Sequence, residues 1–351
     1  MKKPILVLAG KTSKKFREMV DYATKDYAPN IITSFEELPD MRGKKIIFAI
    51  ELDQCGFNES LSKILLKLKK RGEKSLINSK AVIIIKSVNE LFTKSMAQKV
   101  ILICNQMGCE FPGHSVVEAI ESLKNFQTWQ KTYKVPLLQI YKNKCREMIY
   151  NLIKEKSIKI SHPKILVLHS SFIKTSNTLM LWRMVKKYMI DEEIRELHVE
   201  NGTVVDCRGC SYTTCIHYSE QKSCFYGGIM VKEILPAIEN ADCIIWLCPN
   251  YNDAVSAKLM AVINRITVLY KRIDFRNKTV FSIIVSGNSG SDCVASQLIG
   301  ALNINKGFRL PPYFSLMAIA NDPGAVKEIS GINLKAETFS NRIKEEIKRN
   351  L

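Results

Sequence analysis

The sequence predicts an α/β protein built from two doubly wound parallel-sheet domains. Short apolar segments that suit buried strands alternate with longer segments of helical periodicity, as in a parallel sheet covered by helices on both faces. The chain has 351 residues, which is long for a single hydrophobic core. In addition, the second half of the chain repeats the apolar pattern of the first.

The repeat is carried by three pairs of apolar segments: 5–9 with 165–169, 45–50 with 243–248, and 81–86 with 280–285. After the last pair, each half continues into a helical stretch that stops at a glycine, Gly108 or Gly307. Glycine suits the position just beyond a helix C-terminus. The extra length of the second half falls between its first and third strands.

The second half should contain five strands, near 164–169, 194–199, 243–248, 279–286 and 310–316. Between and after them we expect helices near 176–189, 227–239, 254–270, 291–305 and 334–349. A helix at about 138–157 closes the first half, which gives domains of residues 1–158 and 159–351. Ligands of such open sheets bind outside the carboxyl ends of the strands.

Composition indicates a soluble globular protein, with 46% hydrophobic and 25% charged residues. No apolar run reaches the ~20 residues of a membrane-spanning helix. The apolar stretch near the N-terminus is shorter than the ~7–15 residues of a secretory signal, so we expect a first strand and a cytoplasmic protein with no membrane partner. Eleven cysteines in a reducing compartment then argue against a disulfide scaffold.

The formal net charge of +18 raises the question of nucleic-acid binding. The lysines are spread along predicted helix faces such as residues 63–71, and no basic patch is interleaved with aromatic residues. We therefore expect no nucleic-acid partner. A positive field would instead favour anionic nucleotides.

Three polar turns follow neighbouring predicted strands of the second half. Ordinary helix caps and turns explain each of them singly, but their joint placement favours a phosphorylated ring cofactor. The first offers hydroxyls and unpaired first-turn N–H groups to a phosphate, and glycines in the third allow a close approach to a ring. The candidate residues are Ser170, Ser171, Ser176, Asn177 and Thr178, then Pro249, Asn250, Tyr251 and Asn252, then Ser286, Gly287 and Gly290.

These turns resemble, in order, those of the flavodoxin-like NAD(P)H-dependent FMN reductases and their iron–sulfur flavoprotein branch. The resemblance covers about residues 163–320 and adds Ser256, Lys258 and the pair Asn264 and Arg265. It implies that the twelve turn residues bind FMN and that no side chain is catalytic, because the chemistry belongs to the cofactor. The chain departs from the family pattern at His169, where glycine is usual, at Phe172 and Ile173, which are bulkier than the usual first-loop residues, and at Asn264, where aspartate is common.

A cluster of cysteines lies in the extra segment, at Cys207, Cys210, Cys215 and Cys224. The resemblance suggests a 4Fe–4S cluster, although the gaps after Cys210 are wider than in the branch. Two alternatives stay open: a zinc site that uses three or four of these thiols or His217, and an unmetallated loop with structural or redox-sensitive thiols. Tyr212, Tyr218 and Phe225 would suit a lid over a flavin ring.

The first half looks like a degenerate flavodoxin-like domain without a cofactor. Residues 9–13 mimic the end of a phosphate-binding P-loop, but Ile5 stands where that motif needs glycine. Glu51 and Asp53 would repel a flavin phosphate. Because the family often builds its flavin site across a dimer interface, we expect a homodimer or an intrachain pseudo-dimer.

The resemblance implies an FMN-dependent oxidoreductase that passes electrons from NAD(P)H through flavin to an unidentified acceptor. One alternative is a non-catalytic flavodoxin-like sensor or interaction module. The other is an iron–sulfur flavoprotein that carries electrons to a protein partner.

Overall fold

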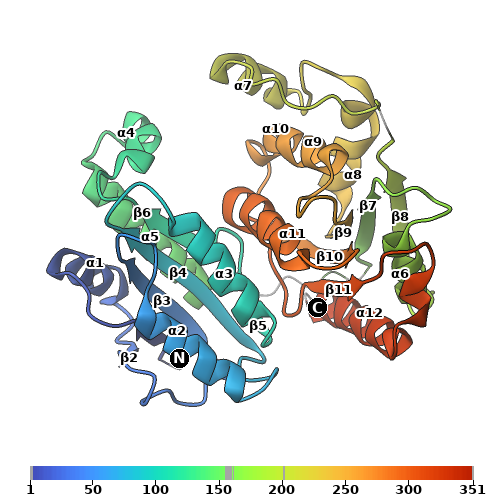
Figure 1. Ribbon diagram of the computed structural model, residues 1–351. Helices are drawn as coiled ribbons and strands as arrows, with labels where there is room; N and C mark the ends of the chain where they lie inside the picture. The colour runs from blue at the N-terminus through green and yellow to red at the C-terminus, as the bar shows by residue number, and fades with distance from the viewer. Residues whose placement is uncertain (1–2, 155–159, 161, 201, 350–351) are drawn as a thin grey trace. The chain divides into compact units, whose positions relative to one another are not determined.

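The computed structural model describes residues 3–154, 160, 162–200 and 202–349. It divides into two compact units, Met1–Lys156 and Ser157–Leu351, each with a parallel sheet between helices (Figure 1). The predicted fold class is confirmed. The predicted boundary between residues 158 and 159 lies outside the described residues. Within the described part, no helix has the length and apolar character needed to cross a bilayer.

The first unit has the strand order β2-β1-β3-β4-β5, and β6 also pairs with β4. Its strands are β1 (Ile5–Leu8), β2 (Asn30–Ile32), β3 (Lys45–Leu52), β4 (Ser79–Ser87), β5 (Cys109–Glu110) and β6 (Val116–Ala119). Its helices are α1 (Lys14–Thr24), α2 (Glu59–Lys70), α3 (Thr93–Asn105), α4 (Gln127–Tyr133) and α5 (Leu137–Lys154), with a short 3₁₀ turn η1 (Lys124–Phe126). Helices α1 and α5 pack on one face of the sheet through a shared core that includes Phe16 and Ile149.

The second unit has the strand order β11-β10-β9-β7-β8, all parallel. Its strands are β7 (Lys164–His169), β8 (Glu193–His198), β9 (Cys243–Pro249), β10 (Thr279–Ser286) and β11 (Ser315–Ile319). Its α-helices are α6 (Asn177–Lys186), α7 (Tyr212–Glu220), α8 (Leu235–Asn240), α9 (Ala257–Arg265), α10 (Thr267–Tyr270), α11 (Ser291–Leu298) and α12 (Ile332–Arg349). Two π-helical segments, η2 (Met230–Ile234) and η3 (Ile299–Lys306), and a 3₁₀ turn η4 (Ala325–Glu328) complete it.

Four of the five strands predicted for this unit lie close to their expected positions. The fifth, expected at 310–316, begins only at Ser315. Pro311 and Pro312 lack the N–H donors that a strand ladder needs, so regular pairing starts after them. The helix expected at 254–270 is divided into α9 and α10, and α7 was not predicted.

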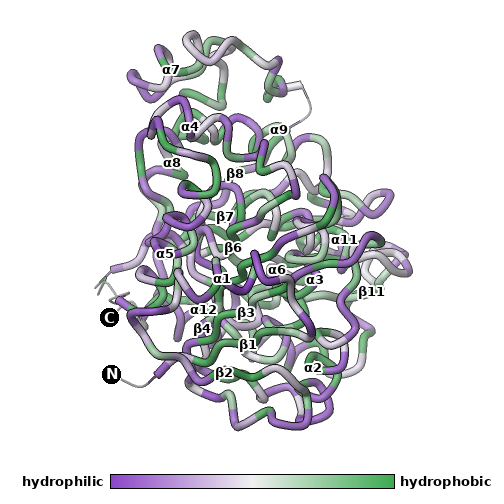
Figure 2. Tube along the Cα trace, turned by 90° about the vertical axis from the view of Figure 1, so that its left-hand side faces the viewer, coloured by the Kyte–Doolittle hydropathy of each residue, from purple (hydrophilic) through white to green (hydrophobic). Residues whose placement is uncertain are grey.

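The strands form the apolar centre of each unit, as the hydropathy colouring shows (Figure 2). Every residue of β9 and β10 is buried, because both strands are central and helices cover both faces of the sheet. On the face covered by α6 and α12, the core includes Trp182, Phe281 and Phe339. The rings of Phe281 and Phe339 meet edge to face at 5.6 Å.

Strand register corrects the predicted alignment of the two halves by one residue. Ile5 pairs with Ile46, whereas Leu166 pairs with Ile244. If Ile46 corresponds to Ile244, then Ile5 corresponds to Leu166 and not to Ile165. A one-residue shift moves every side chain to the other face of the sheet, so the predicted pairing of 5–9 with 165–169 is off by one. In the corrected alignment, Leu8 of the first unit is the equivalent of His169 of the second.

In both units, the helix that follows the third pair of apolar segments, 81–86 and 280–285, ends in the same way. The Asn105 amide donates to the Cys109 carbonyl at 3.0 Å, and the Asn303 amide donates to the Phe308 carbonyl at 2.8 Å. The asparagine lies three residues before its glycine in the first unit and four in the second. The wider π-helical winding of η3 accommodates the additional residue.

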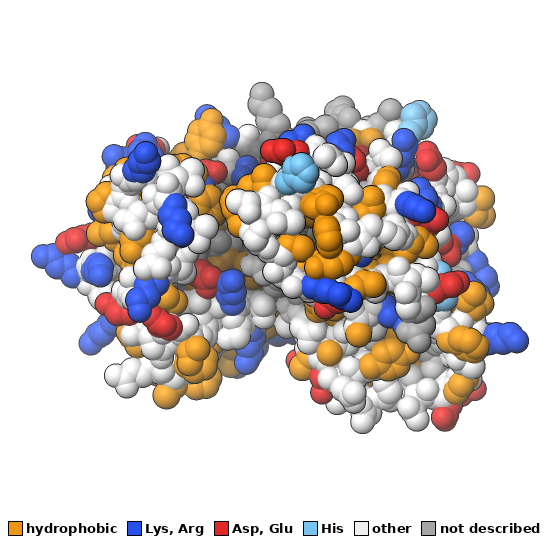
Figure 3. All heavy atoms as spheres, turned by 90° about the horizontal axis from the view of Figure 1, so that it is seen from above, with side chains coloured by type: hydrophobic (Ala, Val, Ile, Leu, Met, Phe, Trp, Pro, Cys, Tyr) orange, Lys and Arg blue, Asp and Glu red, His pale blue; other side chains and the backbone are white. Residues whose placement is uncertain are grey.

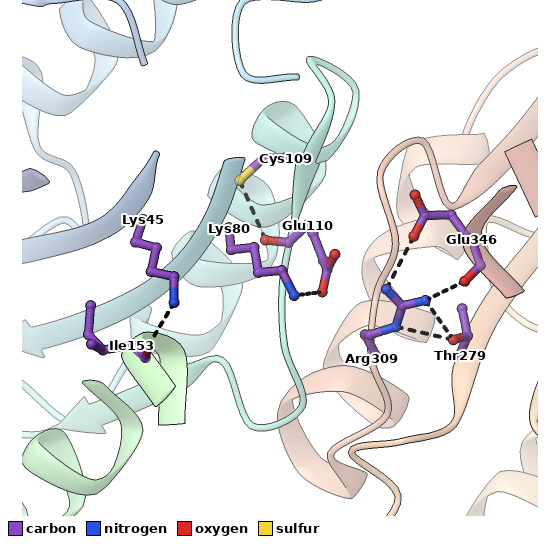
Figure 4. A network of polar contacts seen from close by, with 8 residues as sticks. All are labelled: Lys45, Lys80, Cys109, Glu110, Ile153, Thr279, Arg309 and Glu346. Atoms are coloured by element: carbon purple, nitrogen blue, oxygen red, sulfur yellow. Dashed lines mark hydrogen bonds and ion pairs between the residues drawn. The ribbon is translucent and has the colours of Figure 1, made fainter. Parts of the chain in front are cut away.

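Polar contacts that are partly or fully buried reinforce both sheets (Figure 4). In the first unit, Lys80 and Glu110 form an ion pair at 3.0 Å. In the second, Arg309 donates to the Thr279 hydroxyl at 3.1 Å and to a Glu346 carboxylate oxygen at 3.2 Å. The side chains of Arg309 and Glu346 are 8% and 5% exposed, so this pair ties α12 to the sheet away from water.

We expect Arg309→Met to lower the free energy of unfolding of the second unit by about 3–5 kcal/mol, because it deprives the buried Glu346 carboxylate of its cation. Urea unfolding followed by tryptophan fluorescence measures the change, with Trp182 and Trp246 reporting on the second unit and Trp129 on the first. Arg42→Met is the matched control, because the Arg42–Asp40 pair is exposed and should contribute nothing measurable. Equal losses in the two variants would contradict the role given to the buried pair.

Candidate functional site

Three predicted turns come together at the carboxyl ends of the adjacent strands β7, β9 and β10. The Ser170 hydroxyl lies 2.8 Å from the Ser256 hydroxyl, which links the turn after β7 to the start of α9. The Asn250 amide donates to the Ser286 hydroxyl at 3.0 Å and to the Ser289 carbonyl at 2.8 Å, which links the turns after β9 and β10. That this cluster binds a cofactor stays a prediction.

The first turn combines a helix cap with a buried hydroxyl that lacks a partner. Ser176 caps α6, and its hydroxyl accepts a hydrogen bond from the Leu179 N–H at 3.2 Å. The Ser171 hydroxyl is fully buried and has no hydrogen-bond partner among the described residues. An unsatisfied buried polar group costs about 1–3 kcal/mol, which makes this hydroxyl a candidate donor to a ligand. The bulky Phe172 and Ile173 are exposed and do not fill the turn.

Asn177 has a different role from the one predicted for its side chain. Its amide donates to the Asp322 carbonyl at 2.8 Å, and its amide oxygen accepts from the Gly324 N–H at 2.9 Å. The side chain therefore holds the segment after β11 against the start of α6. Its main-chain N–H, together with that of Thr178, is the group that this position offers to an anion.

The other two turns are shaped by tight backbone geometry. Asn252 and Asp253 both have positive φ, at 54° and 55°, and the Tyr251 side chain is exposed. Gly290 has φ of 84°, and a Cβ atom there would lie 1.6 Å from the Asp253 carboxylate. A glycine at position 290 is thus required by the neighbouring turn itself. Gly287 lies close to Asn321, with 3.0 Å between a virtual Cβ and the amide oxygen.

The cysteine-bearing segment, residues 205–227, forms a closed excursion that we call the cysteine lobe. Arg265 is buried at the end of α9 and donates to the Val205 carbonyl at 3.1 Å and to the Gly227 carbonyl at 2.9 Å. Next to it, the Asn264 amide donates to the Asp206 carboxylate at 2.9 Å. The Asn264 and Arg265 pair, singled out by the resemblance, therefore holds the two ends of the lobe.

The four cysteines of the lobe do not form a metal site in this structure. Among the described residues, no group of three or more His, Cys, Asp or Glu side chains is placed to hold a metal ion. Cys215 belongs to α7, whereas the Cys210 thiol contacts the Tyr226 hydroxyl at 3.8 Å. The predicted ligand set of Cys207, Cys210, Cys215 and Cys224 thus does not fit an iron–sulfur cluster or zinc as arranged. His217 is exposed and packs edge-on against Tyr218.

Aromatic and basic side chains cover the lobe. Tyr218, Phe225 and Tyr226 form a row of edge-to-face contacts, with ring centroids 5.5 and 5.2 Å apart. Lys271 lies over the ring of Tyr212 at 4.5 Å, and Tyr212 and Phe225 are 70% and 59% exposed. Hydrophobic side chains are visible at this end of the second unit (Figure 3). The sequence indicated three of these aromatics but not Tyr226.

A stacked histidine pair, of which His169 is buried and His198 half-buried, lies beside the first turn and was not predicted. The rings of His169, at the end of β7, and His198, at the end of β8, stack at 4.7 Å. His169 is 5% exposed, and its Nδ1 atom has no partner among the described residues. Burial, with a further contribution from His198, lowers the pKa of His169 to about 4. His169 is therefore neutral at pH 7.

Comparison with known proteins supports the predicted resemblance in the second unit. Residues 163–322 match the family model of NADPH-dependent FMN reductases, which confirms the resemblance to FMN reductases predicted for about residues 163–320. The resemblance to the iron–sulfur flavoprotein branch stays a prediction. The match does not extend to the first unit. No curated protein matches the chain.

Several solved structures are similar to about half of the chain. One is an NAD(P)H:quinone oxidoreductase from Methanothermobacter marburgensis, at 16% identity and a TM-score of 0.40, covering 52% of this chain and 96% of that one. Another is an FMN-dependent NADH-azoreductase from Bacillus anthracis, at 12% identity and a TM-score of 0.39, covering 51% and 99%. A third is a flavodoxin from Fusobacterium nucleatum, at 14% identity and a TM-score of 0.32, covering 52% of this chain and 98% of that one. These scores are low, so the assignment rests on the family model.

The buried His169 should make stability depend on pH. The unfolded chain binds a proton near pH 6.5 and the folded chain only near pH 4, so stability is full above pH 6.5 and falls as the pH is lowered toward 4. At pH 5 the loss should be about 2 kcal/mol. Urea unfolding at pH 7 and pH 5 measures it. The His169→Leu variant, which has the leucine found at the equivalent Leu8 of the first unit, should lose less stability between pH 7 and pH 5. A loss equal to that of the wild type would show that His169 is not the cause of the pH dependence.

Proposed function

We propose that the chain is an FMN-dependent oxidoreductase, on the premise that residues 163–322 form a domain of the NADPH-dependent FMN reductase family. It would take electrons from NAD(P)H and pass them to an acceptor. FMN, when bound, supplies the hydride and single-electron chemistry, while the protein supplies binding, orientation and electrostatics. The observation that carries the proposal is the meeting of three polar turns at the ends of β7, β9 and β10.

The first turn suits the phosphate of FMN. The N–H groups at the start of α6 and the Ser171 hydroxyl would donate hydrogen bonds to it, and the helix dipole favours a negative charge there. The Ser170 and Ser256 hydroxyls, 2.8 Å apart, hold this turn to the neighbouring one. Burial keeps the His169 imidazole uncharged, so this side chain would add no positive charge beside the phosphate.

The second and third turns suit the ring. Pro249 ends β9 as a buried residue, and the Asn250 amide is locked by the turn after β10. The Asn250 side-chain oxygen is buried without a partner among the described residues, so it would accept a hydrogen bond from a ligand N–H. Tyr251 is exposed beside it and would pack against a flat ring.

The alternatives differ in what they require of the lobe and of the turns. An iron–sulfur electron carrier needs its thiols to gather, and the described cysteines do not. A sensor or interaction module needs no bound flavin. A homodimer or pseudo-dimer stays a prediction, and the acceptor is open.

The visible spectrum of the full-length protein after incubation with FMN and gel filtration tests the proposal. We expect a yellow protein with two flavin absorption bands, and oxidation of NADH or NADPH that depends on the bound flavin. A protein that retains no flavin would contradict the proposal and favour the non-catalytic module. If the protein binds flavin but does not oxidise NADH or NADPH, the proposed enzymatic activity is refuted while the proposed FMN binding is retained.

Replacement of Ser171 separates phosphate binding from ring binding. Ser171→Ala should weaken FMN binding about 10- to 100-fold, because a hydrogen bond to a charged group contributes about 1.5–3 kcal/mol. Flavin fluorescence titration measures the affinity. Riboflavin, which lacks the phosphate, should bind the variant and the wild type equally. Ser62→Ala is the control, because the Ser62 hydroxyl donates to the Asn58 carbonyl in the first unit and belongs to none of the three turns.

A further inference from the structure

The first unit carries charged residues where the second has uncharged ones. With the corrected register, Glu51 at the end of β3 corresponds to Pro249 at the end of β9. Lys86 at the end of β4 corresponds to Val285. In both units these residues are direct cross-strand partners, Glu51 with Lys86 and Pro249 with Val285.

The Glu51 carboxylate binds the start of α1. Ser13 caps α1 as Ser176 caps α6, and each hydroxyl accepts from the N–H three residues later at 3.2 Å. In the first unit, however, Ser13 also donates twice to Glu51. Its main-chain N–H reaches one carboxylate oxygen at 2.5 Å, and its hydroxyl reaches the other at 2.7 Å. The start of α1 is thus bound to the Glu51 carboxylate of the same chain, in the place where a helix start could bind an anionic ligand.

Lys86 supplies the countercharge. Its ammonium lies 3.0 Å from Glu51 and 2.9 Å from Glu121, and the residue is 7% exposed. Burial tends to raise the pKa of Glu51, but the hydrogen bonds from Ser13 and the contact with Lys86 outweigh it and leave the pKa below its usual value. The carboxylate is therefore charged at neutral pH.

The frame around this carboxylate is otherwise that of a ligand site. The Asn58 amide donates to the Ala9 carbonyl at 3.1 Å and to the Glu51 carbonyl at 2.9 Å, so it ties the turn after β1 to the end of β3. In the second unit, the contact between Ser170 and Ser256 ties the corresponding turns. The two units thus share linked turns and a capped helix, and they differ in the presence of a carboxylate.

We propose that Glu51 is the built-in occupant of an anion site in the first unit, at the position equivalent to the turn between β7 and α6 of the second. With Glu51 in place, the site is closed to phosphate-bearing ligands. Without it, Ser13, the start of α1 and Lys86 form a site for a phosphate-class anion. The proposal concerns the first unit only and does not depend on whether the second binds FMN.

Anion rescue of Glu51→Ala in the full-length protein tests the proposal. Hydrogen exchange of the amides of residues 13–24, read by mass spectrometry at pH 7, reports on α1 in sodium phosphate and in sodium chloride of equal ionic strength. We expect faster exchange in the variant than in wild type in chloride. Phosphate at tenfold its dissociation constant should slow that exchange about tenfold, and the wild type should show no such response.

Glu121→Ala is the matched control. It removes the other carboxylate partner of Lys86 but leaves Glu51 in the site, so exchange in residues 13–24 should not respond to phosphate. Any effect of phosphate on the second unit is common to all three proteins and cancels in the comparison.

The outcomes separate a ligand role from a purely structural one. If Glu51→Ala responds to phosphate no more than Glu121→Ala and wild type do, Glu51 is only a structural ion-pair partner and the proposal is overturned. If Glu51→Ala does not fold in chloride, refolding in phosphate decides: recovery of α1 protection supports the proposal, and failure in both salts overturns it.

Discussion

The parallel pairing of β7, β9 and β10 fixes the whole candidate site. A one-residue slip would turn every side chain of these strands to the other face of the sheet, so the close packing of the core holds their register. This register places the three turns side by side at the carboxyl ends of the strands. Ser170, Ser256 and Asn250 then lock the turns together by hydrogen bonds. The first unit has the same parallel pairing between β3 and β4, and for this reason Glu51 occupies the position equivalent to Pro249.

Much of the fold could be predicted from the sequence, because apolar segments, glycines and prolines mark strands and turns locally. The register of the repeat could not. A strand buried on both faces is apolar at every position, so its sequence carries no alternation from which to read the inward side. Only the hydrogen-bond ladder shows that Leu166, and not Ile165, corresponds to Ile5. The late start of β11 follows from Pro311 and Pro312, which the sequence displayed but the prediction did not weigh.

The turns of the site could be predicted, whereas the duties of single side chains could not. Asn177 and Gly290 have the residue types expected near a cofactor, yet the structure uses the Asn177 amide to hold the segment after β11 and Gly290 to admit Asp253. The cysteines are a second example, because their spacing along the chain does not show in which direction each thiol points. Cys215 lies in α7, which the sequence did not predict. The stacked pair His169 and His198 joins residues from two strands, and no local pattern announces it.

Arg265 gives the cysteine lobe a defined base, since one guanidinium holds both Val205 and Gly227. Chain between two fixed ends can lengthen at an entropic cost that grows only with the logarithm of its length. The sheet therefore need not change when the lobe does. The lobe can therefore change in length or sequence without disturbing the strands beneath it, as long as Arg265 continues to hold its two ends.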